Sequence, residues 1–158
     1  MVDGRLEGIY IADRKGVELH RVETVEAAPG RGLIGDRYCR QQAIAKPDQE
    51  VTLIALEALE ALSREHGIAL APGQARRNLL TRGVPLNDLV GREFAIGDVC
   101  LRGLRLCEPC DHLEMLTQPG VKDGLCHRGG LRAQIVRGGL LQTGDSIQLR
   151  EGLNDESI

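Results

Sequence analysis

The sequence predicts a mainly β fold, a twisted, barrel-like sheet with one or two flanking helices. About seven short segments of strand-like apolar residues are separated by turn signals, which is typical of a curled or closed sheet. Gly-Asp pairs at Gly97-Asp98 and Gly144-Asp145 directly precede two of these segments. Only one stretch has strong helical periodicity, which disfavours a doubly wound parallel sheet because that fold needs a helix between successive strands.

The amino-terminal part is predicted to form two strands followed by a loop. Residues Arg5–Ala12 alternate in part between polar and apolar side chains, and residues Val17–Val25 do so more weakly. Residues Pro29–Arg37 contain three glycines within six positions. We expect a turn-rich loop there, because glycine reaches backbone conformations that are closed to other residues.

One strong helix is predicted from Leu56 to His66, after a short apolar run at Val51–Ile54. Leucines recur at helical spacing on one face, and charged residues lie off that face: Leu56, Leu59 and Leu62 against Glu57, Glu60 and Arg64. Gly67 follows directly and suits a left-handed cap at the end of the helix.

Further short strands are expected along the rest of the chain, at Ala75–Leu80, Glu93–Ile96, Val99–Leu106, Ala133–Val136 and Ser146–Leu149. Together these elements form a single domain over residues 1–150, which is an ordinary domain length. Residues 151–158 have almost nothing to bury, and we expect a disordered tail there.

Composition excludes several classes of protein. No apolar run approaches the roughly 20 residues that a membrane helix needs, and the amino terminus lacks a secretory signal, so we expect a cytoplasmic protein with no membrane partner. The odd number of five cysteines agrees with free thiols in a reducing compartment. The net charge of −3 argues against a nucleic-acid partner, because general nucleic-acid binders carry a basic face.

Soft metal ligands are concentrated in one segment, which contains Cys107, Cys110 and the pair Cys126-His127. Pro109 should end the strand near Leu106, and a helix should start at Cys110 or Asp111. A thiol at a helix start faces unpaired N–H groups, which favour the thiolate, the nucleophilic and metal-binding form. Cys110 is therefore the main candidate for a functional residue.

A series of short motifs resembles the MOSC domain family, which includes the carboxy-terminal domain of molybdenum cofactor sulfurase and the mitochondrial amidoxime reducing component. The motifs fall in the family's order between about Gly30 and Gln148: Gly32–Arg37, Ala75–Gly83, Leu89–Gly91, Ile96-Gly97, Pro109-Cys110, Arg128–Gly130 and Gly138–Asp145. The resemblance implies a strongly twisted, barrel-like β fold, in agreement with the strand pattern.

The resemblance also implies site residues. Cys110 matches the cysteine that ligates molybdenum in amidoxime-reducing members and that is thought to carry sulfur in the sulfurase domain. Arg76 and Asn78 match a motif that holds the phosphate and pterin of the molybdenum cofactor. Further candidates for anion binding are Arg82, Arg37, Arg128 and Arg132. The pyridoxal phosphate of the sulfurase belongs to another domain of that protein, and we do not expect it here.

Three functions follow as hypotheses. The first is a molybdenum-dependent reductase of N-hydroxylated small molecules, with Cys110 as the metal ligand and a separate electron-donor protein. The second is a non-catalytic sulfur carrier that holds a persulfide on Cys110. The third is a zinc-stabilised interaction domain with ligands from Cys107, Cys110, Cys126 and either His127 or His112, although a zinc ribbon would need a cysteine at the position of Gly129.

Each of these candidate residues could instead have a purely structural role. Cys110 could be a buried structural thiol, because free cysteine is among the most buried residue types. Cys107, Cys39 and Cys100 are expected to pack, and Arg76 and Arg77 could lie on a solvated strand face.

Overall fold

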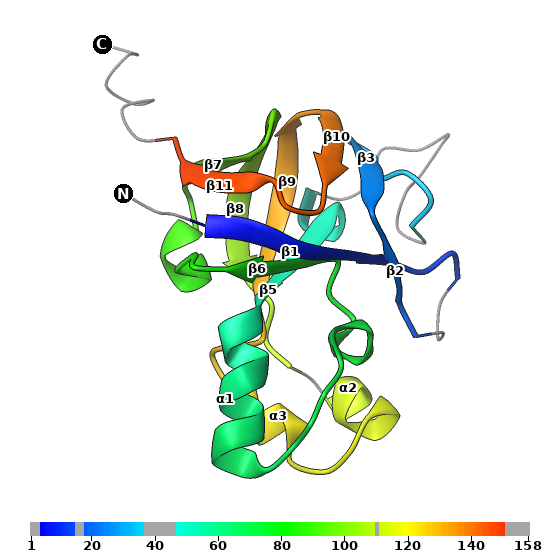
Figure 1. The fold of residues 1–158 in the computed structure, drawn as a ribbon, viewed down its shortest axis with the longest axis vertical. Helices are drawn as coiled ribbons and strands as arrows, with labels where there is room; N and C mark the ends of the chain where they lie inside the picture. The colour runs from blue at the N-terminus through cyan, green and yellow to red at the C-terminus, as the bar shows by residue number, and fades with distance from the viewer. Residues whose placement is uncertain (1–3, 15–17, 37–46, 110, 151–158) are drawn as a thin grey trace.

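The chain folds around a closed β-barrel, as seen in a computed structural model that describes residues 4–14, 18–36, 47–109 and 111–150 (Figure 1). The barrel strands lie in the order β11-β7-β8-β9-β5-β6-β1, and β1 pairs with β11 to close the ring. Their bounds are β1 Gly4–Ile11, β5 Val51–Ala55, β6 Leu79–Arg82, β7 Glu93–Ile96, β8 Val99–Leu106, β9 Leu131–Arg137 and β11 Ser146–Leu149. The predicted mainly β, barrel-like fold is confirmed.

The closing ladder between β1 and β11 is short. It pairs Gly4 with Ile147 and Arg5 with Ser146 in antiparallel register. The neighbours β5 and β6 run parallel, and helix α1 (Leu56–His66) forms the crossover between them. The other neighbouring pairs of the ring are antiparallel.

A smaller sheet extends the barrel on one side. It contains β10 (Gly139–Gln142), β3 (Thr24–Ala28) and β4 (Gly32–Leu33) in that order. The short strand β2 (His20–Val22) pairs with the end of β1. In the described part of the expected strand Val17–Val25, the chain forms two strands, β2 and β3. They belong to different sheets, so the expected single strand is divided.

Helices cover one end of the barrel, where α1, α2 (Asp111–Leu116) and α3 (Val121–Gly124) lie together below the strands in Figure 1. Short 3-10 turns occupy connections at Pro47–Gln49, Pro72–Ala75 and Leu86–Leu89. The predicted helix Leu56–His66 is confirmed, and Gly67 caps it in the left-handed conformation with φ 68°. No helix in the described ranges is long and apolar enough to cross a bilayer.

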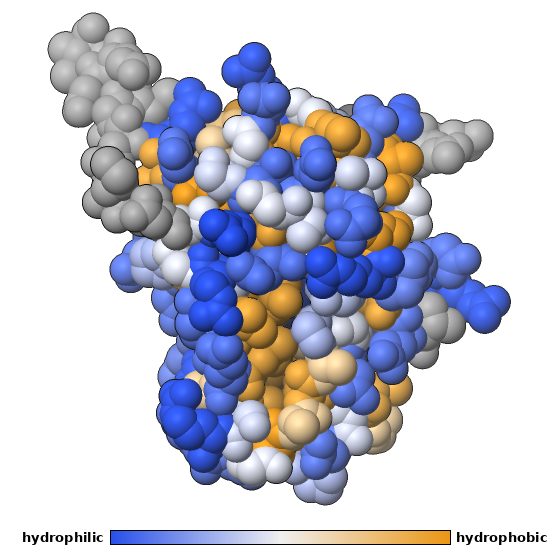
Figure 2. Space-filling model, in the orientation of Figure 1, coloured by the Kyte–Doolittle hydropathy of each residue, from blue (hydrophilic) through white to orange (hydrophobic). Residues whose placement is uncertain are grey.

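The apolar side chains form two packed clusters. The first fills the barrel and includes side chains with no exposed surface, such as Leu6, Ile9, Leu53, Phe94 and Leu101. The second joins the helices to the outer face of the strands through Leu59, Leu62, Leu113, Val121 and Leu125. Figure 2 shows that some apolar residues remain on the surface of the end that the helices cover, with hydrophilic residues on both sides of them.

The structure corrects parts of the sequence interpretation. The expected strand at Ala75–Leu80 begins only at Leu79, because a 3-10 turn runs through Ala75 and Arg76 has a positive φ of 60°. Strand β10 and the two-residue β4 were not expected. Residues 37–46 and the predicted disordered tail at 151–158 lie outside the described residues.

A buried carboxyl group connects the smaller sheet to the barrel. Glu50 is 2% exposed, and its Oε1 accepts hydrogen bonds from the N–H groups of Gly30 (3.3 Å) and Ile135 (3.1 Å). Burial raises the pKa of Glu50, and the two N–H donors oppose that rise. Folding is therefore less favourable when Glu50 is ionised than when it is protonated.

We expect Glu50→Gln to change how stability depends on pH. Because the folded pKa of Glu50 is raised, the wild type gains stability relative to the variant as pH falls through that pKa, and loses it as pH rises again. Urea unfolding at several values between about pH 4 and 8 measures the difference, with Glu26→Gln on the exposed side of β3 as the control. An identical pH dependence in both variants would contradict the assignment.

Candidate functional site

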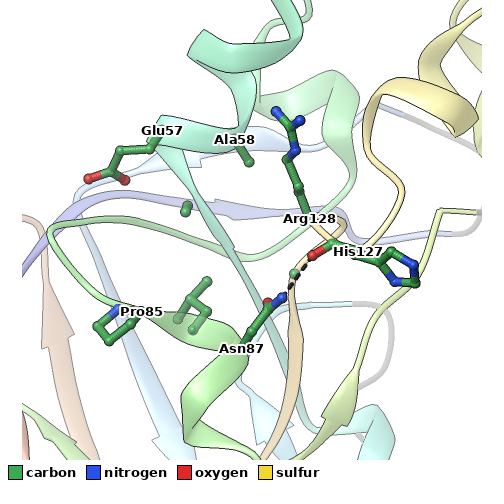
Figure 3. Close-up of a pocket in the computed structure, with 9 residues that line it drawn as sticks. Glu57, Ala58, Pro85, Asn87, His127 and Arg128 are labelled. Carbon is green, nitrogen blue, oxygen red and sulfur yellow. Dashed lines mark hydrogen bonds between the residues drawn. The ribbon is translucent and has the colours of Figure 1, made fainter.

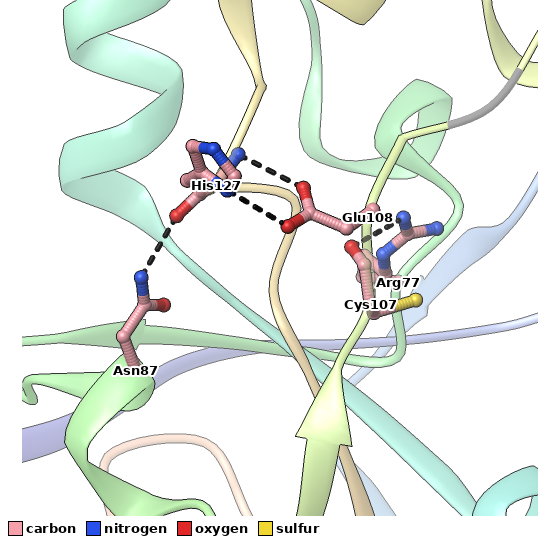
Figure 4. A network of polar contacts seen from close by, with 5 residues as sticks. All are labelled: Arg77, Asn87, Cys107, Glu108 and His127. Carbon is pink, nitrogen blue, oxygen red and sulfur yellow. Dashed lines mark hydrogen bonds and ion pairs between the residues drawn. The ribbon is translucent and has the colours of Figure 1, made fainter.

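The candidate site centres on the turn that follows β8. The backbone N–H of Cys107 donates to the carbonyl of Gly130 at 2.7 Å, so the chain leaves β8 still attached to the start of β9. The guanidinium of Arg77 donates from Nε to the carbonyl of Gly129 (2.8 Å) and from Nη2 to that of Cys107 (3.3 Å; Figure 4). Arg77 therefore fixes the two segments to each other, and it does not lie on a solvated strand face.

Two glycines allow this close approach. A Cβ atom on Gly129 would collide with the Cys107 carbonyl and with Pro109. Gly130 has φ 116°, and a Cβ there would collide with the Leu53 carbonyl in β5. The Gly129-Gly130 pair thus lets one backbone pass between β5 and the turn at residues 107–109.

A polar network holds His127 beside the same turn (Figure 4). Glu108 accepts the His127 backbone N–H at Oε1 (2.9 Å), and its Oε2 lies 3.0 Å from Nδ1 of the imidazole. The Nδ2 of Asn87 donates to the His127 carbonyl at 2.8 Å. His127 has a positive φ of 61°, which is uncommon outside glycine, and these three contacts hold it there.

A pocket of about 270 Å³ lies next to this network, between the start of α1 and the chain before β9 (Figure 3). Its lining includes Ala58, Pro85, Asn87, His127 and Arg128. Ala55 precedes α1 without a side-chain cap, and Nη2 of Arg128 pairs with Oε1 of Glu65 at 2.8 Å. The uncapped N–H groups at the start of α1 favour an anion, whereas the acidic Glu57 in the same lining opposes one, and the Arg128 guanidinium is paired near the other end of the helix.

A second, more polar pocket of about 210 Å³ contains Arg76. Gln74 from the preceding 3-10 turn, Glu18, and Leu116 and Thr117 at the end of α2 complete its lining. Arg76 and Arg77 therefore diverge: Arg76 lines this pocket, and Arg77 binds the turn after β8.

Asn78 has its amide engaged inside the protein. Its Oδ1 accepts from the backbone N–H and the hydroxyl of Thr52, both at 3.1 Å, and its Nδ2 donates to the carbonyl of Tyr10 at 3.0 Å. The side chain, 6% exposed, joins β5 to β1. Its contact with a pterin stays a prediction, and the structure gives it a positioning role in the sheets.

The remaining predicted residues are dispersed. Arg82, at the end of β6, pairs with Glu60 of α1 at 3.0 Å, and Arg132 lies in β9 opposite Thr52. Cys110 and Arg37 lie outside the described residues, as does Cys39, although Pro109 and Asp111 on either side of Cys110 are described. Cys107 and Cys100 are buried, and burial raises the pKa of the Cys100 thiol, whereas Cys126 is exposed.

Comparison with known families agrees with this arrangement of motifs. The sequence pattern of the MOSC domain matches residues 40–148, more than half of the chain. The chain belongs to the MOSC domain family. No curated protein matches the sequence.

Solved structures resemble this MOSC domain over nearly its full length. YuaD from Bacillus subtilis is 19% identical, with 94% of this chain and 98% of that chain covered and a TM-score of 0.79. YiiM from Geobacillus stearothermophilus is 15% identical, with coverage of 94% and 75% and a TM-score of 0.73. YiiM from Escherichia coli is 18% identical, with coverage of 92% and 69% and a TM-score of 0.67. At these identities the likeness concerns the fold.

Sequence reasoning missed the roles of Arg77, Glu108, Asn87 and the backbone of His127. Their contacts span between 19 and 52 positions of sequence, so no local pattern indicates them. A usable signal was the Gly129-Gly130 pair, because consecutive glycines before a strand indicate close backbone approach.

Proposed function

We propose that this MOSC protein binds the molybdenum cofactor and reduces N-hydroxylated small molecules, with Cys110 as the metal ligand and a separate protein as electron donor. The observation that supports this proposal most is that contacts connect the turn at residues 107–109 to residues that line two pockets or adjoin them in the sequence. Arg77, beside Arg76 of the polar pocket, binds the Cys107 carbonyl, and His127 of the larger pocket binds Glu108.

The side chains of the two pockets fit the anionic part of such a cofactor. Arg76 offers a planar guanidinium in the polar pocket, and the larger pocket lies at the uncapped start of α1, so each pocket offers donors to a phosphate. Each volume lies below the roughly 300 Å³ of a typical small-molecule pocket, so each suits only a portion of the cofactor. Asn78 would contribute indirectly, because its hydrogen bonds hold β5 and β1 together and so position the residues just before it in the sequence, Arg76 and Arg77.

When bound, the cofactor would supply two-electron chemistry at the metal. The protein would supply a soft thiolate from Cys110, which suits a metal already held by sulfur. Arg77 and the Gly129-Gly130 pair would hold the turn at residues 107–109, which precedes Cys110 in the sequence.

Metal and pterin analysis tests the proposal directly. Protein purified from a host with active cofactor synthesis should contain molybdenum and pterin at about one per chain. With a chemical electron donor, it should reduce an N-hydroxylated compound such as an amidoxime.

The absence of both molybdenum and pterin, even after the cofactor is supplied, would reject the reductase. The sulfur-carrier hypothesis would then be tested through the mass of the peptide that contains Cys110, since a persulfide adds the mass of one sulfur atom. The two outcomes are distinct because the first concerns bound metal and the second a covalent change of the chain.

A further inference from the structure

A group of mixed metal-binding side chains lies beside the turn after β8. The function proposed above uses the contact between His127 and Glu108 within this group but assigns the group no metal. Glu108 belongs to the turn, whereas Cys126 and His127 belong to the loop between α3 and β9. One ligand atom of each residue lies within 4.8 Å of the others, and all three residues are exposed. In the described part of the chain, this group alone unites three such side chains so closely.

The group is held in position before any metal arrives. The two carboxylate oxygens of Glu108 contact the backbone and the ring of His127, and Asn87 holds the His127 carbonyl. The positive φ of His127 places its side chain where a regular turn would not. Since strained conformations persist only where surrounding contacts impose them, the loop is built to present Cys126 and His127 together beside Glu108.

We infer that Glu108, Cys126 and His127 form a zinc-binding site. A thiolate, an imidazole and a carboxylate are the three ligand types that zinc accepts, with bonds of roughly 2.0 to 2.3 Å. Those bonds place tetrahedral ligand atoms about 3.3 to 3.6 Å apart. From within 4.8 Å, the exposed side chains reach this spacing by side-chain rotation.

The donor set differs from the zinc site considered from the sequence, which included Cys107 and Cys110. Cys107 is 3% exposed and does not belong to the group, and Glu108 takes its place beside Cys126 and His127. Within the described residues the group offers three protein ligands, and a tetrahedral zinc ion with these three has a fourth position for water or a further ligand. Binding releases the Cys126 thiol proton and involves no oxidation or reduction.

Zinc titration of the full chain in a Cys110→Ser background tests the site independently of any molybdenum chemistry. After treatment with a chelator, isothermal titration should show about one zinc per chain. Cys126→Ser, His127→Asn and Glu108→Gln should each weaken zinc binding by at least about tenfold, whereas His20→Asn on β2 should not. Asparagine is chosen at position 127 because it tolerates a positive φ.

Further measurements test Cys126 as a ligand directly and separate the loss of a ligand from the loss of the fold. Cobalt in place of zinc should give a thiolate-to-metal charge-transfer absorption that is lost in Cys126→Ser, and zinc should protect Cys126 from alkylation. Metal-free variants should unfold at the same urea concentration as the parent, which separates loss of a ligand from loss of the fold. Equal zinc affinity in Cys126→Ser and His20→Asn, or no zinc binding by the parent, would overturn the inference.

Discussion

Gly130→Ala should destabilise the barrel by about 2 to 5 kcal/mol. The added Cβ would meet the carbonyl oxygen of Leu53 in β5, and the backbone at φ 116° is itself unfavourable for alanine. Overpacking against backbone costs about 1 to 3 kcal/mol, and a left-handed conformation adds roughly 1 to 2 kcal/mol. Urea unfolding followed by circular dichroism measures the loss.

Gly144→Ala is the matched control for the steric part of this effect. Gly144 has a similar φ of 99° before β11, but a Cβ there would meet nothing within 4 Å. Only the conformational cost of about 1 to 2 kcal/mol should therefore appear. Equal losses in the two variants would show that the contact with Leu53 contributes nothing and that the backbone near residue 130 moves away.

Cys110→Ser should reduce the proposed reductase activity to background. A hydroxyl is a poor ligand for a metal held by sulfur, so oxygen-atom transfer should be lost while the cofactor still binds through its anionic part. Arg76→Ala should behave differently, because it removes charge-assisted hydrogen bonds worth about 1.5 to 3 kcal/mol and so weakens cofactor retention roughly 10- to 150-fold. Activity with a chemical electron donor and bound pterin are measured on the same samples.

The control for this pair is Arg64→Ala, which changes an exposed arginine near the end of α1 that pairs with Glu65 at 3.8 Å. It should retain both cofactor and activity. Full activity in Cys110→Ser would exclude the thiol as an essential ligand. Asn78→Ala is a less specific probe, because it also removes the hydrogen bonds to Thr52 and Tyr10 and should destabilise the fold.

Elements determined by local patterns were predictable from the sequence. Helix α1 and strands β7, β8 and β11 have the predicted bounds, because leucine spacing, Gly67, Pro109 and the Gly-Asp turns act within a few residues. Strand β10 was not predictable, since it pairs with β3 more than 100 positions earlier in the chain. Tertiary pairing of this kind leaves little trace in a short window.

The candidate site shows the same division. Its ligand-rich segment was evident from residue types, and the end of β8 at Leu106, shortly before Pro109, was predicted from the chemistry of proline. The hydrogen bond between Asn78 and Tyr10 joins residues 68 positions apart in the sequence, and that between Arg77 and Gly129 joins residues 52 positions apart. Such contacts depend on which strands become neighbours, and the residue types alone leave that open.

The ladder between β1 and β11 gives this protein a particular order of assembly. A ribosome releases β1 first and β11 last, so the ring cannot close while the chain between them is still being made. Until Ser146–Leu149 emerge, β7 and part of β1 keep unpaired edges, and such edges promote association between chains. Loss of those four residues should therefore lower the yield of native protein far more than their small share of the core suggests.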